Sequence, residues 1–187
     1  MFILRILALT LGVIWRLYWY VMEKRADKRK PKTRKDAIVW EEIGIILLTT
    51  FVVLNLFDIV LFPFRNTLVQ CIGFIITCLG FAECMSARYV LADNWANSFE
   101  YQIKKKHELV TKGIYTYVRH PIYGGMWLMG TGMLLVAGTY LVALFIPLVF
   151  IGIIPLALRE EALLTKAFGK QYRTYMRTSQ RFIPFIV

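Results

Sequence analysis

The stretch GGMWLMGTGMLLVAGTYLVALFIPLVFIGIIPLAL, residues 124–158, contains no charged side chain. At about 1.5 Å of rise per residue, it is too long for one helical crossing of a hydrocarbon core about 30 Å thick. The run therefore predicts two membrane helices joined by a tight turn, which we place at Ala137-Gly138-Thr139. This hairpin gives one span over about 121–136 and another over about 140–159.

The rest of the chain has the composition of an integral membrane protein. Of its 187 residues, 58% are hydrophobic and 19% are charged, and the mean hydropathy is +0.55. Apolar runs over 2–21, 39–62 and 68–87 are each long enough to cross a bilayer. The first run lacks a cleavage site for a signal peptidase, so we expect it to be a span. The predicted fold class is an all-α polytopic membrane protein with about five transmembrane helices.

Basic residues gather in three segments that a five-span chain places on one side of the membrane. Residues 22–38 hold eight Lys or Arg, residues 88–119 hold six, and the tail after residue 159 gains five more. Cytoplasmic loops are enriched in Lys and Arg, so we expect the N-terminus outside and the C-terminus inside. The net charge of +11 then indicates attraction to lipid headgroups of the bilayer rather than to nucleic acid.

We expect residues 1–187 to form a single membrane domain. Residues 1–87 make three N-terminal spans, and residues 88–187 hold the polar motifs. The three cysteines (Cys71, Cys78 and Cys84) lie in one apolar run without CxxC spacing, which is typical of buried free thiols. Two histidines are too few for a His-rich metal site, so we expect no metal.

The first polar motif is GIYTYVRHPIYGG, residues 113–125. Pro121 disfavours helical geometry at the residue before it and suits the first position of a helix. A span therefore begins at Pro121, with Arg119 and His120 at its N-terminus. Free backbone N–H groups, the helix dipole and a guanidinium together favour an anionic ligand there. The same residues are also typical of a simple anchor at headgroup level.

The second polar motif is Arg159-Glu160-Glu161, which follows the uncharged run directly. Carboxylates at the end of a membrane span are costly unless they are paired or solvated. The hairpin places them at the same depth as Arg119 and His120. Cations on one helix and carboxylates on its neighbour suit a zwitterion such as an amino acid, although ordinary headgroup-level charges would look the same.

The tail after Arg159 predicts a further helix. Its apolar face has helical spacing, and Gly169 is a suitable helix end. We expect this helix to be amphipathic and to lie along the cytoplasmic surface. It would act either as a lid over a pocket or as an anchor. The face consists of Leu163, Leu164, Ala167 and Phe168.

These motifs, in this order and at these spacings, resemble the signature of the isoprenylcysteine carboxyl methyltransferase and phospholipid methyltransferase superfamily. The resemblance covers about residues 86–187, while the first 85 residues match only as generic spans. The length and the five-span layout resemble the small prokaryotic members. The matching pieces are Asn94-Trp95, His107-Glu108-Leu109-Val110, Gly113-Ile114-Tyr115, Arg119-His120-Pro121-Ile122-Tyr123-Gly124, Arg159-Glu160-Glu161, Phe168-Gly169, Tyr172, Tyr175 and Arg181-Phe182-Ile183-Pro184.

The resemblance implies S-adenosylmethionine as methyl donor and S-adenosylhomocysteine as product. It also implies a cytoplasm-facing pocket closed by the C-terminal segment and a lipophilic acceptor that enters from the bilayer. The chain has no strand–GxGxxG–helix pattern, which agrees with a site unlike that of soluble methyltransferases. The catalytic residues implied are Arg119, Arg159 and Glu161. The cofactor-binding residues implied are His107, Leu109, Val110, Gly113, Tyr115, Arg119, His120, Pro121, Tyr123, Glu160 and Glu161.

The sequence does not decide which chemical group accepts the methyl group. A carboxylate is ionised at neutral pH and needs only a cation, Arg119 or Arg159, to orient it. An amine, as in phosphatidylethanolamine, must lose a proton, so Glu161 would act as base. A thiol is also possible. The family pattern favours a carboxylate on a prenylated substrate or a small isoprenoid acid.

Two other classes of protein remain as alternatives. Sterol-type reductases that use NADPH share an RHPxYxG-like stretch, although they usually have more spans. A non-catalytic lipid-binding membrane protein is the second alternative. Binding of S-adenosylhomocysteine, of NADPH, or of neither distinguishes the three classes.

Overall fold

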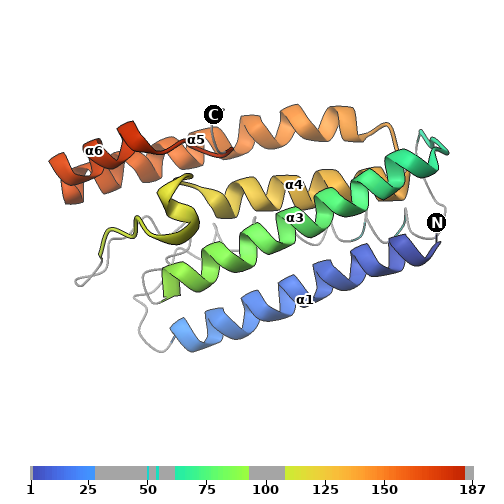
Figure 1. Ribbon diagram of the computed structural model, residues 1–187, viewed down its shortest axis with the longest axis horizontal. Helices are drawn as coiled ribbons and strands as arrows, with labels where there is room; N and C mark the ends of the chain where they lie inside the picture. Colours follow the sequence, from blue (N-terminus) through green and yellow to red (C-terminus); the bar gives the residue numbers. More distant parts are fainter. Residues whose placement is uncertain (1, 28–49, 51–53, 55–61, 93–107, 184–187) are drawn as a thin grey trace.

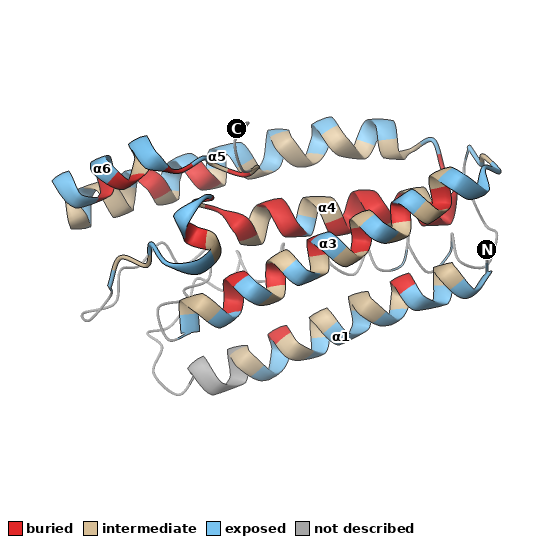
Figure 2. Ribbon diagram, in the orientation of Figure 1, coloured by how far each residue is buried: buried red, intermediate tan, exposed pale blue. Residues whose placement is uncertain are grey.

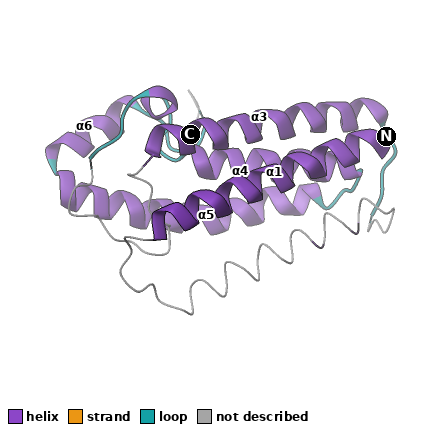
Figure 3. Ribbon diagram, turned by 90° about the horizontal axis from the view of Figure 1, so that it is seen from below, coloured by secondary structure: helices purple, strands orange, loops and turns teal. Residues whose placement is uncertain are grey.

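The computed structural model describes residues 2–27, 50, 54, 62–92 and 108–183, and these are arranged as a bundle of long helices (Figure 1). In the described part of the chain, helices are joined by loops and turns, and there is no strand (Figure 3). The helices are α1 (Phe2–Asp27), α3 (Thr67–Leu91), α4 (Pro121–Ala137), α5 (Val142–Phe168) and α6 (Lys170–Thr178), with a 3-10 turn, η2, at Gly113–Thr116.

The helices confirm the predicted class of an all-helical membrane protein. Three of them are long and apolar enough to cross a bilayer, over Phe2–Met22, Thr67–Leu91 and Val142–Phe168, and α4 is a shorter apolar helix. The second predicted span, 39–62, lies outside the described residues except at 50, 54 and 62. The three cysteines are free thiols, as predicted.

The hairpin between α4 and α5 confirms the turn predicted at residues 137–139. Helix α4 ends at Ala137, and Gly138 adopts a left-handed conformation with φ 79°. Glycine reaches this conformation without the steric cost that a Cβ atom brings. The loop before α3 is bonded to the same turn, because Phe64 N donates to Gly138 O at 2.7 Å. The end of the hairpin is thereby attached to the start of α3.

Glycines bring α3 and α4 into backbone contact. A Cβ atom on Gly80 would lie within 2.5 Å of Gly125 O and closer still to Met129 N, and one on Gly132 would lie 2.5 Å from Gly73 O. Small residues allow membrane helices to approach this closely. The buried positions accordingly gather along α4 (Figure 2). The N-terminus of α4 therefore belongs to a closely packed pair of helices.

The tail differs from the prediction. Helix α5 continues through Arg159 and the predicted apolar face to Phe168, so these residues extend the fifth helix instead of starting a new one. Gly169 ends α5, as predicted, and a separate short helix, α6, follows at once. The charged residues from 159 onward mark the end of the apolar run, but they are good helix formers and do not end the helix.

Candidate active site

The site is built at the N-terminus of α4. His120 is the N-cap residue, with φ −123°, and Pro121 occupies the first turn. Pro121 has no backbone N–H to leave unpaired in that turn, which is why the helix begins there. His120 is buried, with 5% of its surface exposed. The predicted start of this helix is confirmed.

The C-terminal segment, residues 179–183, lies along the residues that precede α4. Arg119 N donates to Gln180 O at 2.8 Å, His120 N donates to Arg181 O at 2.9 Å, and Gln180 N donates to Tyr117 O at 2.8 Å. These bonds form a short parallel bridge between Val118 and Gln180. The end of the chain is therefore fixed beside the first motif, about sixty residues away in sequence.

Glu161 lies at the centre of a group of five charged or titratable side chains, the charged cluster (Arg119, His120, Glu160, Glu161 and Arg181). Arg119 Nε and Arg181 Nε each donate to Glu161 Oε1 at 3.0 Å, and Arg181 Nη2 donates to Oε2 at 3.0 Å. His120 Nε2 is 3.3 Å from the same Oε1. The Glu161 carboxylate of α5 is thus held by residues at the N-terminus of α4 and by the C-terminal segment.

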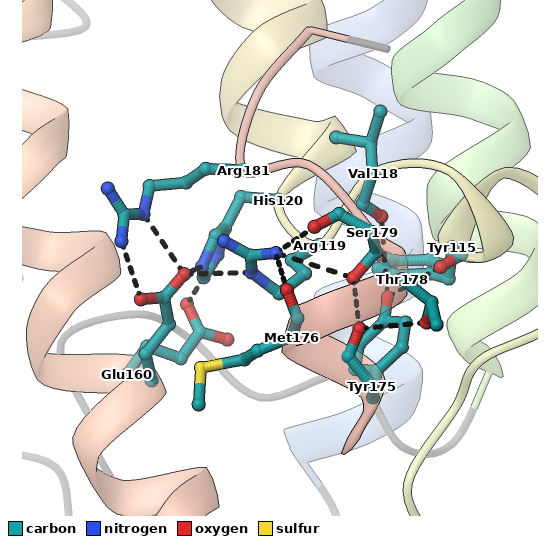
Figure 4. Close-up of polar contacts among 11 residues, drawn as sticks. Tyr115, Val118, Arg119, His120, Glu160, Tyr175, Met176, Thr178, Ser179 and Arg181 are labelled. Atoms are coloured by element: carbon teal, nitrogen blue, oxygen red, sulfur yellow. Dashed lines mark hydrogen bonds and ion pairs between the residues drawn. The ribbon is translucent and has the colours of Figure 1, made fainter. Parts of the chain in front are cut away.

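Arg119 also fixes the end of α6. Its Nη1 donates to Met176 O at 3.1 Å and to the carbonyl oxygen of Ser179. Carbonyls at a helix C-terminus have no partner within the helix, so a cation beside them is favourable. A single guanidinium therefore joins the first motif, α5 and α6 (Figure 4).

Glu160 forms the more open side of the cluster. Tyr123 OH donates to Glu160 Oε2 at 3.3 Å, and His120 Nδ1 lies 3.5 Å from the same oxygen. The Glu160 side chain is 42% exposed, whereas that of Glu161 is 8% exposed. Burial alone would lower the pKa of His120, but its hydrogen bonds with Glu160 and Glu161 outweigh burial and raise the pKa above 6.5. The two carboxylates thus favour a protonated imidazole between them.

Two buried tyrosines of α6 complete the site. Tyr175 OH donates to Tyr115 O at 2.6 Å, and burial raises the pKa of Tyr175 to about 12, so the hydroxyl keeps its proton. Tyr172 is 1% exposed, and its hydroxyl has no hydrogen-bond partner among the described residues. The charges of Glu161 and Arg119 both act on that hydroxyl. An unused donor therefore lies beside the charged cluster.

The sequence of this chain matches that of a known protein family. The family profile of phospholipid methyltransferases matches residues 68–171, more than half of the chain. The chain belongs to the phospholipid methyltransferase family. The resemblance inferred from the motifs is confirmed. The match runs from the start of α3 into α6 and ends before the C-terminal segment.

Relatives of known name are methyltransferases of this family. Protein-S-isoprenylcysteine O-methyltransferase of Schizosaccharomyces pombe is 36% identical over 118 residues, which cover 62% of this chain and 48% of the relative. A probable protein-S-isoprenylcysteine O-methyltransferase of Oryza sativa subsp. indica is 26% identical over 174 residues, covering 89% and 88%. The chain thus spans about half of the yeast relative and most of the rice one.

One solved structure supports the same fold. It is a eukaryotic intramembrane Ras methyltransferase, isoprenylcysteine carboxyl methyltransferase, with a TM-score of 0.59 and 25% sequence identity. The similarity covers 63% of this chain and 43% of the other. The helical membrane fold is therefore shared over the larger part of this chain.

The structure brings most of the predicted site residues together. Arg119, His120, Tyr123, Glu160 and Glu161 meet in or beside the cluster, Pro121 begins the helix behind it, and Tyr115 accepts the bond from α6. Leu109 and Val110 lie in the loop before η2, and Gly113, with φ 62°, packs against Val90 of α3. His107 lies outside the described residues.

Two residues differ from the prediction. Arg159 is exposed and makes no hydrogen bond or ion pair with another described residue, so it does not join the cluster. Along helix α5 it precedes Glu161 by two positions, and residues two apart do not share a helix face. Arg181 provides the second guanidinium instead. The only signal for Arg181 was its place in the Arg-Phe-Ile-Pro motif.

Proposed function

We propose that this chain is an integral membrane methyltransferase that uses S-adenosylmethionine to methylate a lipophilic acceptor. The favoured acceptor is the carboxylate of an isoprenylcysteine or of a small isoprenoid acid. The observation that carries the proposal is the charged cluster around Glu161, assembled at a helix N-terminus in a chain of a methyltransferase family.

The residues present fit the amino acid end of this cofactor. The Tyr172 hydroxyl is a buried donor without a partner among the described residues, and the charge of Arg119 acts on it. The N-terminus of α4, where Arg119 lies, favours a carboxylate. The exposed part of Glu160 can accept bonds from an ammonium group. When bound, S-adenosylmethionine supplies a methyl group that is already activated by a sulfonium. The chain therefore needs mainly to position the acceptor and exclude water.

Gly124 leaves space for the C-terminal segment beside the first turn of α4. A Cβ atom there would lie 2.7 Å from Phe182 O and 3.3 Å from Glu83 Oε1. The C-terminal segment can therefore approach the first turn of α4 only because residue 124 lacks a side chain. This close approach supports a pocket covered by that segment, with η2 and the loop at Leu109 and Val110 as the proposed adenosine side.

The cluster favours a carboxylate acceptor over an amine. A carboxylate needs a cation to orient it, and Arg119 and Arg181 are both present. An amine needs a base, and both oxygens of Glu161 are already held by cationic side chains. The relatives named above methylate isoprenylcysteine according to their names, which agrees with this choice.

We infer a five-span topology with the site on the cytoplasmic side, as the distribution of Lys and Arg predicts. In this arrangement the N-terminus lies outside, and α6 and the C-terminal segment lie inside. Residues 1–187 would then act as one membrane domain, with the first three spans supporting the α4–α5 hairpin.

Calorimetric titration with S-adenosylhomocysteine tests the proposal. We expect micromolar binding to the detergent-purified protein and loss of binding in Arg119→Ala. Arg159→Ala is the matched control, because this exposed arginine has no described partner, and it should bind like the wild type. Circular dichroism of each variant shows whether its helices are retained.

Two outcomes would overturn the proposal. A folded wild type that binds NADPH but not S-adenosylhomocysteine would be a reductase. A folded wild type that binds neither would be non-catalytic. If the cofactor binds, methyl transfer to an N-acylated farnesylcysteine, compared with phosphatidylethanolamine, identifies the acceptor class.

A further inference from the structure

Helix α6 carries a continuous basic face on its exposed side. Lys170, Arg173 and Arg177 are all exposed and are spaced at i, i+3 and i+7, so they lie on one side of the helix. The sequence of α6, KQYRTYMRT, contains no acidic residue. The buried tyrosines, Tyr172 and Tyr175, occupy the opposite side. One face of this helix is therefore aromatic and buried, and the other is cationic and open.

The buried face of α6 covers the charged cluster. Tyr175 OH donates to Tyr115 O, and Arg119 donates to the carbonyls of Met176 and Ser179 at the end of the helix. If α6 moves away, Tyr115 and Arg119 lose these partners. The position of α6 and the geometry of the cluster are therefore coupled.

The path of the chain brings the basic face back toward the membrane. Helix α5 carries the chain beyond the uncharged run to Phe168, Gly169 reverses it, and α6 leads back toward the charged cluster (Figure 1). The Arg181–Glu161 ion pair fixes the end of this return at the depth of the α4 N-terminus. Along the axis of α6, Arg177 lies about 10 Å nearer to this fixed end than Lys170 does, which is seven residues of helix rise.

The positive charge of this short helix is not balanced by acidic partners within the described part of the chain. None of its three cations makes an ion pair with another residue in the described part of the chain. A helix of nine residues is marginal on its own, and Arg173 and Arg177, four positions apart, repel each other. An anionic surface beside α6 would remove this repulsion and add attraction.

We propose that the basic face of α6 (Lys170, Arg173 and Arg177) binds anionic phospholipid headgroups and that this contact holds α6 over the charged cluster. Guanidinium groups bind phosphate by paired hydrogen bonds, which suits Arg173 and Arg177. Headgroups are favoured over a soluble acidic partner because α5 fixes α6 close to the bilayer. Electrostatic attraction falls off over about 8 Å at physiological salt, so Arg177 should contribute most and Lys170 least.

Hydrogen–deuterium exchange of the α6 amides tests this proposal without any cofactor. The protein is placed in nanodiscs of phosphatidylcholine alone or with about 30% phosphatidylglycerol, a strongly anionic surface. We expect the amides of residues 170–178 to exchange about five- to twentyfold more slowly in the anionic discs, because each cation near such a surface contributes about a fivefold factor. High salt should remove most of this difference.

Three variants make the test specific to the basic face. Arg173→Gln/Arg177→Gln should lose the response to phosphatidylglycerol, whereas Arg173→Lys/Arg177→Lys keeps the charge and should retain it. Arg65→Gln, which removes an exposed cation from the loop before α3, should respond like the wild type. A double glutamine variant that still responds would overturn the proposal. Equal exchange in the two kinds of disc for the wild type would also overturn it.

The result is independent of the proposed function. If α6 responds to anionic lipid but the protein does not bind S-adenosylhomocysteine, the lipid-binding role of α6 is supported and the proposed methyltransferase function is overturned. If the protein binds S-adenosylhomocysteine equally in both kinds of disc and the exchange of α6 does not change, the methyltransferase proposal stands and the lipid-binding role of α6 is overturned.

Discussion

The α3–α4 interface and the charged cluster hold this protein together by opposite means. Along α3 and α4, glycines allow backbone atoms of the two helices to meet directly, with small side chains such as Thr77 and Cys84 packed between them. In the cluster, three cationic side chains and two carboxylates connect α4, α5 and the C-terminal segment across hydrogen bonds. The α3–α4 contact depends on glycines that lack a side chain, whereas the cluster depends on charged side chains at defined positions.

The difference matters for function. Close packing between α3 and α4 cannot be rearranged without overlap of atoms, so this pair is suited to support the N-terminus of α4. Hydrogen bonds and ion pairs can be exchanged for those of a ligand that carries the same charges. If the proposed cofactor binds here, we expect its amino acid end to exchange bonds with the cluster while α3 and α4 keep their packing.

The largest effect should follow from removing the centre of the cluster. Glu161→Ala leaves Arg119 and Arg181 without their buried carboxylate, and breaking a buried ion pair by removing one partner typically costs about 3–5 kcal/mol. We expect a large fall in the free energy of unfolding and complete loss of S-adenosylhomocysteine binding. Detergent denaturation and calorimetric titration measure the two effects.

Glu160→Ala is the control for the Glu161 variant. It removes the neighbouring carboxylate, whose side chain is 42% exposed, so stability should fall by about 1 kcal/mol or less. Equal losses in the two variants would contradict the central position of Glu161. The cluster would then hold the helices through general charge balance.

A smaller effect should follow from adding one carbon atom to the α3–α4 interface. In Gly80→Ala the new Cβ meets Gly125 O and Met129 N, which are backbone atoms that cannot rotate away. Overpacking of this kind typically costs about 1–3 kcal/mol. We expect a lower midpoint of thermal unfolding but nearly normal cofactor affinity in the protein that stays folded.

Gly152→Ala is the matched control for the interface. This glycine lies within α5, where a Cβ atom would meet nothing within 4 Å. The substitution should stabilise the helix slightly, by up to about 1 kcal/mol, because alanine has the higher helix propensity. If Gly80→Ala is as harmless as Gly152→Ala, the close approach of α3 and α4 is not needed for stability.

Sequence reasoning succeeds here where the cause is local. Pro121 starts a helix because of its own ring, and Gly138 allows a turn because of its own φ angle, so both features could be predicted from a few neighbouring residues. The pairing of Arg119 and His120 with Glu160 and Glu161 could also be predicted, because the hairpin turn fixes which ends of α4 and α5 meet.

Features that depend on distant parts of the chain escaped prediction. The bridge between Val118 and Gln180 and the ion pair of Arg181 arise only after α6 has folded back, and no periodic pattern marks them. Arg159 is a candidate from the sequence because it adjoins the glutamates, but it lies on a face of α5 other than that of Glu161. The glycine contacts between α3 and α4 are likewise visible only after the two helices are packed.

The smallest effect concerns the proton on His120. Its pKa is raised above 6.5 because hydrogen bonds with Glu160 and Glu161 outweigh the opposing effect of burial. The folded protein therefore binds this proton more tightly than the unfolded chain does. The added stability is complete below pH 6.5 and is lost as the pH rises through the folded-state pKa of His120.

We therefore expect the free energy of unfolding to fall as the pH is raised from about 6.5 through the mildly alkaline range, by at most about 1.4 kcal/mol for each unit by which the two pKa values differ. Measurements in steps of pH, in detergent at constant salt, give the profile. In His120→Gln the fall over this range should be smaller than in the wild type, because glutamine does not titrate. A wild-type stability that rises with pH instead would mean that the imidazole is neutral in the folded protein. Glu161 would then be held by charge from the two arginines alone, and the stability of the charged cluster would no longer depend on the proton of His120.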